Sequence, residues 1–389
     1  MYKIQTLNKI SPIGIDLFPR DDYEIASEIV NPDAILLRSF AMHDMEIPAT
    51  VKAVARAGAG VNNIPIDKCT DLGIVVFNTP GANANGVKEL ALAGLLMSSR
   101  KLVPGIMWAK TLIGKGDEVG KLVEKGKSDF TGPEIMGKRL GVIGLGAIGV
   151  MLANDAVELG MEVMGYDPFI SVDAAWRLSR SVKQAKSLEG LLADCDYISL
   201  HVPLTDSTKN MLAKERIAIM KKGVRVLNFS RGALVNNTDM IEALGSGQVG
   251  VYVTDFPDEA LLKQENVIPF PHLGASTPEA EDNCAVMAVN QTKDFLERGN
   301  IKNSVNFPDC DLDFRSKARI VIANKNVPNM VGQITSLLAA EKVNIADMLN
   351  KHKGDLAYNI IDTDGDLPDG ALDKIRAIEG VIMARAIKR

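Results

Sequence analysis

A glycine-rich stretch at residues 139–149, RLGVIGLGAIG, sharply restricts the possible folds of this chain. An apolar run leads into three glycines spaced G-x-G-x-x-G, and apolar residues at helical spacing follow. In such a turn Gly144 permits the tight bend, Gly146 lets a pyrophosphate approach the backbone, and Gly149 lets the helix pack closely on the strand. The free N–H groups and the dipole at that helix N-terminus favour phosphate. The stretch therefore predicts a strand–turn–helix unit that binds a dinucleotide.

An acidic residue after the next expected strand supports this interpretation. The strand at residues 161–166 leads to Asp167, about 20 residues beyond the glycines, where a carboxylate accepts both ribose hydroxyls of NAD. The next residues, 168–170, supply no cation for a 2′-phosphate, so we expect NAD to be preferred over NADP. A turn without a ligand is disfavoured because strand, glycines, helix and acid agree. The residues expected to hold the cofactor here are Gly144, Gly146, Ala147, Ile148, Gly149 and Asp167.

Short apolar strands alternate with helical segments through the first 300 residues, a pattern typical of doubly wound parallel sheets. Expected strands lie at residues 34–39, 73–77, 197–200, 224–228 and 250–253. Residues 114–133, rich in Gly and Lys, are expected to form a surface connection. A helix at about residues 278–298 is expected to return to the first domain, and residues 301–316 are expected to be a linker.

The last seventy residues follow a different plan, with the order β-α-β-β-α-β from about residue 318. This order is the ferredoxin-like arrangement. The segment has no obvious nucleophile, metal-ligand set or phosphate loop. We therefore expect a small binding or assembly module.

Three polar residues follow strands of the dinucleotide unit, where ligands of such sheets bind. Arg231 offers a planar fork for a carboxylate, and His272 supplies an imidazole, the side chain most often used for proton transfer near neutral pH. Glu259 could orient the histidine. Each residue alone has a simpler interpretation, as a surface ion pair, a loop histidine or a solvated acid. Together, at strand ends, they favour catalysis on an alcohol or carbonyl substrate.

Composition excludes several other functions. The net charge of −5 argues against general affinity for nucleic acid or anionic membranes, and no apolar run is long enough to span a bilayer. The N-terminus lacks the apolar core of a signal peptide. The four cysteines are far apart and form no metal-ligand pattern. We expect a cytoplasmic protein with reduced thiols and no metal.

Five motifs connect the chain to a known family. They are residues 56–64 (RAGAGVNNI), 141–149 (GVIGLGAIG), 201–205 (HVPLT), 228–232 (NFSRG) and 271–274 (PHLG). On these residues the chain resembles the D-isomer-specific 2-hydroxyacid dehydrogenases. Within that family it is most similar to the short form that oxidises D-3-phosphoglycerate and ends in an ACT domain.

The resemblance implies an organisation and an activity. A substrate-binding domain would comprise residues 1–90 and 275–305, with a Rossmann NAD-binding domain, residues 91–274, inserted into it. Residues 317–389 would form the ACT-like domain. The implied reaction is NAD-dependent oxidation of D-3-phosphoglycerate to 3-phosphohydroxypyruvate, the first step of serine biosynthesis. The implied assembly is a homodimer through the inserted domain, or a homotetramer.

The resemblance also implies roles for individual residues. Arg231 would bind the substrate carboxylate and carbonyl oxygen, His272 would be the acid–base, and Glu259 its partner. Further cofactor contacts would come from His201, Val202, Pro203, Ser230 and Asp255. Substrate contacts would come from Arg38, Arg56, Ala59, Gly60, Val61 and Asn83, with the two arginines near the phosphate.

One departure from the family pattern concerns the nicotinamide end of the cofactor. The usual order Asp-Val-Phe is replaced by Thr254-Asp255-Phe256, so the acid is displaced by one residue. Either a local shift of the backbone restores the contact with the nicotinamide amide, or Thr254 makes it. The proline usual after the glutamate is replaced by Ala260.

The resemblance to ACT domains implies an amino-acid effector, which is serine in related enzymes. Asn324, Asn326 and Asn344 align with the positions that hold it, and amides both donate and accept hydrogen bonds. However, Asn324 stands where serine-sensitive relatives have histidine, and Asn329 replaces a loop glycine. Weak or altered serine inhibition is therefore expected, with an assembly domain that binds no ligand as the alternative.

Two other functions remain open on this resemblance. One is reduction of glyoxylate or hydroxypyruvate, the activity of sister enzymes. The other is a non-catalytic NAD-sensing scaffold built on the same fold. The ACT-like tail favours phosphoglycerate oxidation over both.

Overall fold

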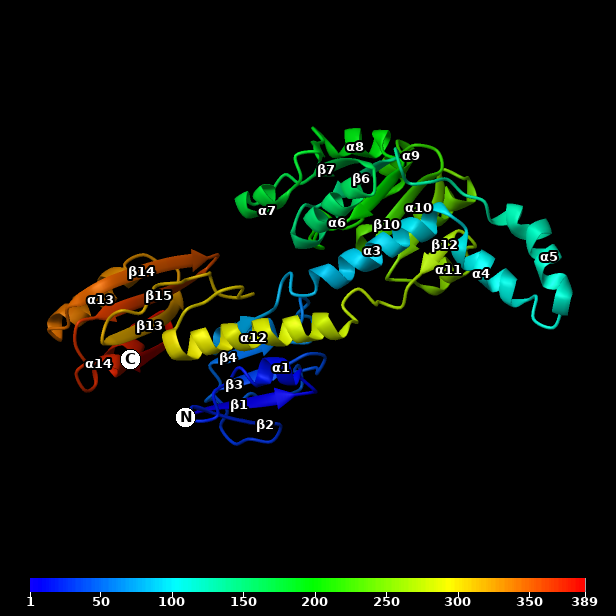
Figure 1. The fold of residues 1–389 in the computed structure, drawn as a ribbon. Coiled ribbons are helices and arrows are strands. Elements are labelled where there is room, and N and C mark those ends of the chain that lie inside the picture. The colour runs from blue at the N-terminus through cyan, green and yellow to red at the C-terminus, as the bar shows by residue number, and fades with distance from the viewer. Residues whose placement is uncertain (389) are drawn as a thin grey trace. The chain divides into compact units, whose positions relative to one another are not determined.

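The computed structural model describes residues 1–388, whose contacts divide the chain into two compact units. The first unit contains Met1–Asn83 together with the chain from Pro278 onwards, and the second is Ala84–Thr277. In the described residues, the first unit has a five-stranded parallel sheet and a four-stranded antiparallel sheet, and the second has a seven-stranded parallel sheet (Figure 1). The predicted α/β architecture is confirmed.

The first sheet has the strand order β2-β1-β3-β4-β5, with every neighbouring pair parallel. Strand β3 is buried throughout because Leu36 enters a core shared with α12, whereas Ile35 and Leu37 enter a second core on the opposite face. Burial on both faces is the rule for such strands. The elements are β1 (Tyr2–Leu7), α1 (Pro12–Ile15), β2 (Tyr23–Ala26), β3 (Ala34–Leu37), β4 (Ala53–Arg56), α2 (Ile66–Asp71), β5 (Val75–Phe77) and α12 (Pro278–Arg298).

The second unit has the strand order β12-β11-β10-β9-β6-β7-β8, again all parallel. The order reverses between β6 and β9, and ligands of open α/β sheets bind at the carboxyl ends of strands beside such a reversal. The elements are β6 (Arg139–Ile143), α6 (Ala147–Glu158), β7 (Glu162–Tyr166), α7 (Val172–Arg177), β8 (Lys183–Gln184), α8 (Leu188–Asp194), β9 (Tyr197–Leu200), α9 (Lys214–Ala218), β10 (Val224–Asn228), η3 (Gly232–Leu234), α10 (Asn237–Gly245), β11 (Val249–Thr254), α11 (Glu259–Leu262) and β12 (Val267–Pro269).

An arm extends from the second unit. Helix α3 (Ala84–Ser99) packs on the sheet through residues such as Val87, Ala91 and Leu95, and a bend of 73° separates it from α4 (Leu102–Lys110). The arm consists of α4 and α5 (Val119–Gly126) with the short turns η1 (Gly116–Glu118) and η2 (Lys127–Phe130). It projects away from that sheet (Figure 1). The segment expected as a surface connection is exposed, but it contains α5. No single helix of the described chain is long and apolar enough to cross a membrane.

The C-terminal module has the predicted β-α-β-β-α-β order and the strand order β14-β15-β13-β16, all antiparallel. One face of its sheet lies under its two helices (Figure 1), where Ile320, Ile322 and Ile361 pack against Ile334 and Leu338 of α13. The elements are β13 (Ala318–Lys325), α13 (Met330–Ala340), β14 (Ile345–Lys353), β15 (Leu356–Thr363), α14 (Ala371–Arg376) and β16 (Val381–Lys388).

The opposite face of the module's sheet is also buried. Val321 and Tyr358 belong to the same apolar cluster as Phe77 of β5 and Phe295 of α12. The segment expected as a linker connects the module to α12, but it is packed rather than free, because Phe307 is fully buried in this cluster. The module therefore completes a core that the first sheet and α12 begin.

Polar contacts from the module reinforce this junction at the last turn of α12. Arg385 donates to the carbonyl oxygens of residues 295 and 296, Arg319 to that of residue 298 at 2.8 Å, and Tyr358 to that of residue 299 at 2.8 Å. Carbonyls at a helix C-terminus lack partners within the helix and carry partial negative charge, so two guanidinium groups suit them. The Arg385 guanidinium also lies 4.5 Å from the centre of the Phe295 ring.

Arg319 is bound on its other side by Asp362, and neither side chain is more than 2% exposed. Nε donates to Oδ1 at 2.5 Å and Nη2 to Oδ2 at 3.0 Å. Arg319→Met would leave that carboxylate buried without its cation, so we expect the free energy of unfolding to fall by about 3–5 kcal/mol. Urea unfolding followed by circular dichroism measures this.

The matched control is Arg177→Met, which breaks an exposed pair with Asp173 on α7. Exposed pairs of this spacing contribute about 0.5 kcal/mol or less. Equal losses of stability in the two variants would contradict a structural role for the buried pair.

Candidate active site

Two of the three glycines of the dinucleotide motif are required by close backbone approaches. Gly144 has φ +92°, and a Cβ there would lie 2.6 Å from the His201 carbonyl oxygen. A Cβ on Gly149 would lie 1.9 Å from the Gly144 carbonyl oxygen. By contrast, a Cβ on Gly146 would meet no described protein atom within 4 Å. Gly144 and Gly149 are thus required by the fold, whereas the space at Gly146 is open to a ligand.

The N-terminus of α6 and Asp167 complete a site that fits NAD. Helix α6 starts directly after Gly146 and no side chain caps it, so its first N–H groups are available to a phosphate. Asp167 accepts hydrogen bonds from the backbone N–H groups of Leu145 and Phe169, both at 2.8 Å. Each carboxylate oxygen accepts more than one hydrogen bond, so both can still bind a ribose hydroxyl. The glycine loop and the acid therefore adjoin one another, as the sequence predicts.

Residues after β9 and β10 adjoin the same edge of the sheet. The backbone N–H of His201 donates to the Ile143 carbonyl at 2.7 Å, and Ser230 Oγ donates to the Leu200 carbonyl at 3.0 Å. Burial lowers the pKa of His201 to about 4, so its ring is neutral at pH 7. The segment of His201, Val202 and Pro203 thus lies beside the glycine loop, and its histidine is poorly suited to proton transfer.

Arg231 follows β10 in extended backbone at the start of η3, and its side chain is exposed. Its guanidinium donates to the Ser230 carbonyl at 2.6 Å. Asn228, fully buried at the end of β10, shapes this turn: its amide donates to the Arg231 carbonyl at 2.9 Å and accepts from Ser230 N–H at 3.2 Å. The role of Asn228 was not predicted, although a polar residue that ends an apolar strand is a sequence signal for one.

Glu259 and His272 do not meet in this structure. Glu259 is the first residue of α11, and its carboxylate pairs with Lys263 at 2.7 Å on the exposed surface. The His272 ring lies edge-on to Phe256, with ring centres 4.9 Å apart. Catalytic hydrogen bonds often form only when substrate is bound. The partnership of Glu259 with His272 therefore stays a prediction.

Asp255 is buried, with 2% of its surface exposed, and its carboxylate accepts backbone hydrogen bonds from Leu273 and Gly274. Thr254 is fully buried, and its hydroxyl accepts from the Phe256 N–H at 3.1 Å. Both side chains are thus already engaged within the second unit. Contact of either with the nicotinamide amide stays a prediction.

The expected phosphate-binding arginines lie at the carboxyl ends of the neighbouring strands β3 and β4 of the first unit. Arg56 Nε donates to the Arg38 carbonyl at 2.8 Å, and its Nη1 donates to the Gly60 carbonyl. Arg38 pairs with Glu281 at the start of α12, 2.6 Å away. Asn78 bonds the Ala59 carbonyl at 2.7 Å, which holds the loop that includes Val61. Asn83 ends the N-terminal segment of this unit.

The three asparagines expected to bind an effector differ in their surroundings. Asn324 is buried, donates to the Lys325 carbonyl and accepts from Asn359, both at 2.7 Å. Asn326 is exposed and donates to the Gly354 carbonyl, and Asn344 is exposed and donates to the carboxylate of Asp364. Only Asn326 and Asn344 thus offer side chains to solvent.

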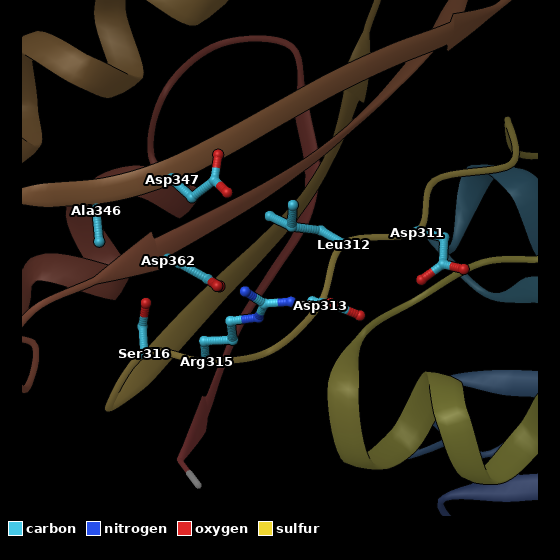
Figure 2. Close-up of a pocket in the computed structure, with 8 residues that line it drawn as sticks. All are labelled: Asp311, Leu312, Asp313, Arg315, Ser316, Ala346, Asp347 and Asp362. Atoms are coloured by element: carbon cyan, nitrogen blue, oxygen red, sulfur yellow. Dashed lines mark hydrogen bonds and ion pairs between the residues drawn. The ribbon is translucent and has the colours of Figure 1, made fainter.

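A surface hollow of about 570 Å³ opens where the connecting segment passes β14 (Figure 2). Arg315 pairs with Asp313 at 2.7 Å, and the carboxylate of Asp362 binds the buried Arg319 instead. No cluster in the described chain is arranged to hold a metal ion. The hollow includes none of the expected effector residues, and its lining is Asp311, Leu312, Asp313, Arg315, Ser316, Ala346, Asp347 and Asp362.

Comparison with known proteins agrees with this geometry. A family model described as "D-isomer specific 2-hydroxyacid dehydrogenase, NAD binding domain" matches residues 95–274. A D-3-phosphoglycerate dehydrogenase of Haemophilus influenzae is 30% identical, over 99% of this chain and 94% of that protein. The chain belongs to the D-isomer-specific 2-hydroxyacid dehydrogenase family, and its second unit contains the family's NAD-binding domain.

Several other relatives with the same name are much longer, and the chain spans less than two thirds of their length. The D-3-phosphoglycerate dehydrogenase of Methanocaldococcus jannaschii is 32% identical over 86% of this chain, which spans only 62% of its length. Among solved structures, the NAD⁺-bound 3-phosphoglycerate dehydrogenase of Entamoeba histolytica is 26% identical, with a TM-score of 0.61 over 78% of this chain and 98% of that one.

The glycines give a test of the cofactor site that separates folding from binding. Gly146→Ala should leave the melting temperature nearly unchanged but weaken NAD binding at least about tenfold, because the new methyl group occupies space that a pyrophosphate needs. Gly149→Ala should lower the melting temperature, because its Cβ collides with the Gly144 carbonyl. Calorimetry with NAD and thermal unfolding measure both effects. NAD affinity unchanged in Gly146→Ala would place the pyrophosphate elsewhere.

Proposed function

We propose that this chain oxidises D-3-phosphoglycerate to 3-phosphohydroxypyruvate with NAD, the first step of serine biosynthesis. The observation that carries the proposal is similarity over nearly the full length of both proteins to a bacterial D-3-phosphoglycerate dehydrogenase. The dinucleotide loop and the polar residues after β10 and β12 supply groups suited to this reaction.

In the proposed reaction, NAD held by the glycine loop and Asp167 would supply the acceptor for the hydride that leaves C2 of the substrate. The Arg231 guanidinium binds the carboxylate and the C2 oxygen in planar geometry. His272 takes the proton of the C2 hydroxyl, so that loss of a hydride and a proton leaves the ketone. Glu259 would stabilise the resulting imidazolium. To do so its carboxylate would leave its ion pair with Lys263 and bind the His272 ring instead.

The substrate phosphate needs cations beyond Arg231. We assign it to Arg38 and Arg56, because the C-terminal ends of two paired strands present both and Arg56 bonds the backbone of Arg38. The backbone N–H groups of residues 59–61 would bind the carboxylate. Asn83 would contact the substrate from the end of the N-terminal segment.

A turnover panel tests the function. NAD reduction or NADH oxidation would be followed with D-3-phosphoglycerate, 3-phosphohydroxypyruvate, glyoxylate and hydroxypyruvate. We expect kcat/KM to be highest for the phosphorylated pair. Arg38→Gln should raise KM for these substrates at least about tenfold, with little change for the unphosphorylated ones. His272→Asn should lower kcat by roughly 10² or more while NAD still binds.

The control is Arg20→Gln, which removes an exposed arginine before β2. Preference for glyoxylate or hydroxypyruvate would favour the reductase alternative. Absence of turnover with every substrate, despite NAD binding, would favour the non-catalytic scaffold.

We also propose that the arm mediates homodimer formation. In the described structure α4 buries none of its residues, although its exposed side chains include Leu102, Val103, Ile106 and Met107. A continuous apolar helix face exposed on a monomer is typical of an interface. Sedimentation equilibrium tests this, since a monomeric wild-type protein would contradict it. A homotetramer would need a second interface.

For regulation, we propose that Asn326 and Asn344 contact a weakly bound serine, since both are exposed in the loops flanking α13. Asn324 would support them from within the sheet. Titration calorimetry with serine tests this: Asn344→Ala should weaken binding at least about tenfold, as expected for loss of a hydrogen bond to a charged group. Asp369→Asn, an exposed change before α14, is the control. Failure of the wild-type protein to bind serine would favour an assembly module.

A further inference from the structure

The backbone at His272 has an unusual conformation. Its φ is +56°, in the left-handed region, which is uncommon for residues other than glycine, although asparagine, aspartate and histidine adopt it more often than the rest. Such residues persist only where the surroundings hold them, and they are common at functional sites. The loop around His272 lies mostly at the surface, since residues 271–273 are all exposed. What holds this histidine must therefore come from the residues beneath it.

A single buried carboxylate meets the loop at that point. Asp255 Oδ1 accepts from the Leu273 N–H at 2.8 Å, and Oδ2 accepts from the Gly274 N–H at 3.1 Å. These are the two peptide groups that directly follow His272. The Asp255 backbone is anchored in turn, because its N–H donates to the Asn228 carbonyl at 3.1 Å. Each oxygen of the carboxylate thus accepts one hydrogen bond from the loop, while the backbone of Asp255 is held at the end of β11.

The loop is also enclosed from other directions. A Cβ added to Gly274 would lie 3.2 Å from Val87 of α3 and 3.4 Å from Asp255 Oδ2. The Phe256 ring packs edge-on against the His272 ring. The loop therefore has little freedom to move away from the carboxylate while the fold is intact.

We propose that Asp255 is a positioning residue, which holds His272 in its left-handed conformation by binding the next two peptide N–H groups. The inference rests on the proposed function, in which His272 transfers the proton. The order Thr254-Asp255-Phe256 makes the contact possible. Asp255 is the first residue after β11, and from there its two carboxylate oxygens reach the peptide N–H groups of Leu273 and Gly274. In this chain the acid serves the histidine loop.

Two substitutions of Asp255 remove its hydrogen bonds to the loop to different extents. Asp255→Val removes both acceptor oxygens, whereas Asp255→Asn keeps one and places an N–H₂ group against the other peptide N–H. Asp196→Asn is the matched control, because that carboxylate also accepts a backbone N–H, from Arg139 at 2.9 Å, but at the amino ends of β6 and β9. All variants are made in the full-length protein.

Hydrogen exchange at the amides of residues 273 and 274 directly measures how well their hydrogen bonds to Asp255 protect them. We expect exchange to accelerate at least about tenfold at both amides in Asp255→Val and at one of them in Asp255→Asn. The Asp196 variant should match wild type. With phosphoglycerate, kcat should fall at least about tenfold in Asp255→Val, while the dissociation constant for NAD changes less than about twofold.

Two outcomes would overturn the proposal. One is unchanged exchange at both amides in a folded variant. The other is a large loss of NAD affinity without faster exchange, which would assign Asp255 to the nicotinamide instead. If Asp255→Val does not fold, Asp255→Asn decides on its own. Exchange is measured without turnover. It therefore tests the hydrogen bonds of Asp255 even if the protein does not oxidise phosphoglycerate, and the two proposals can fail separately.

Discussion

Parallel pairing of the strands in the second unit determines where its chemistry can occur. Strands β6, β9, β10 and β11 run in one direction, so their carboxyl ends reach the same edge of the sheet. The glycine loop, the turn that carries Arg231 and the buried Asp255 all follow these strands. Residues more than one hundred positions apart in sequence are therefore assembled by strand order alone. Local hydrogen bonds then hold the turns in shape, as those of Asn228 do with the backbone of Ser230 and Arg231.

The first unit depends on a different junction, at the C-terminal end of α12. This helix begins beside Arg38, through its pair with Glu281, and ends against Arg319 and Arg385 of the module. One continuous helix thus joins the proposed phosphate-binding end of the first sheet to the C-terminal module. An effector bound to the module could act on the substrate site only through differential affinity for two arrangements of such elements.

Much of the fold was predictable because its signals are local. Alternating strands and helices, the spacing of Gly144, Gly146 and Gly149, and the β-α-β-β-α-β order are patterns of neighbouring residues. The packed state of residues 301–316 was not predictable, because Phe307 is buried by partners such as Tyr358 that are remote in sequence. For the site, types of residue were predictable but contacts were not. Asp255 was expected to serve the cofactor, and only the fold shows that its oxygens bind the histidine loop.

The discontinuous first unit has a consequence for synthesis of the protein. Residues 84–277 form a contiguous compact unit, which can fold as soon as it leaves the ribosome. Strands β1–β5 emerge earlier, yet their core needs α12 and the module, and Tyr2 already bonds the carbonyl of Leu296. The first part of the chain to be made is thus among the last to reach its native packing. Its apolar strands must stay unaggregated while about 300 further residues are translated, and translation at about 5–20 residues per second makes that interval tens of seconds.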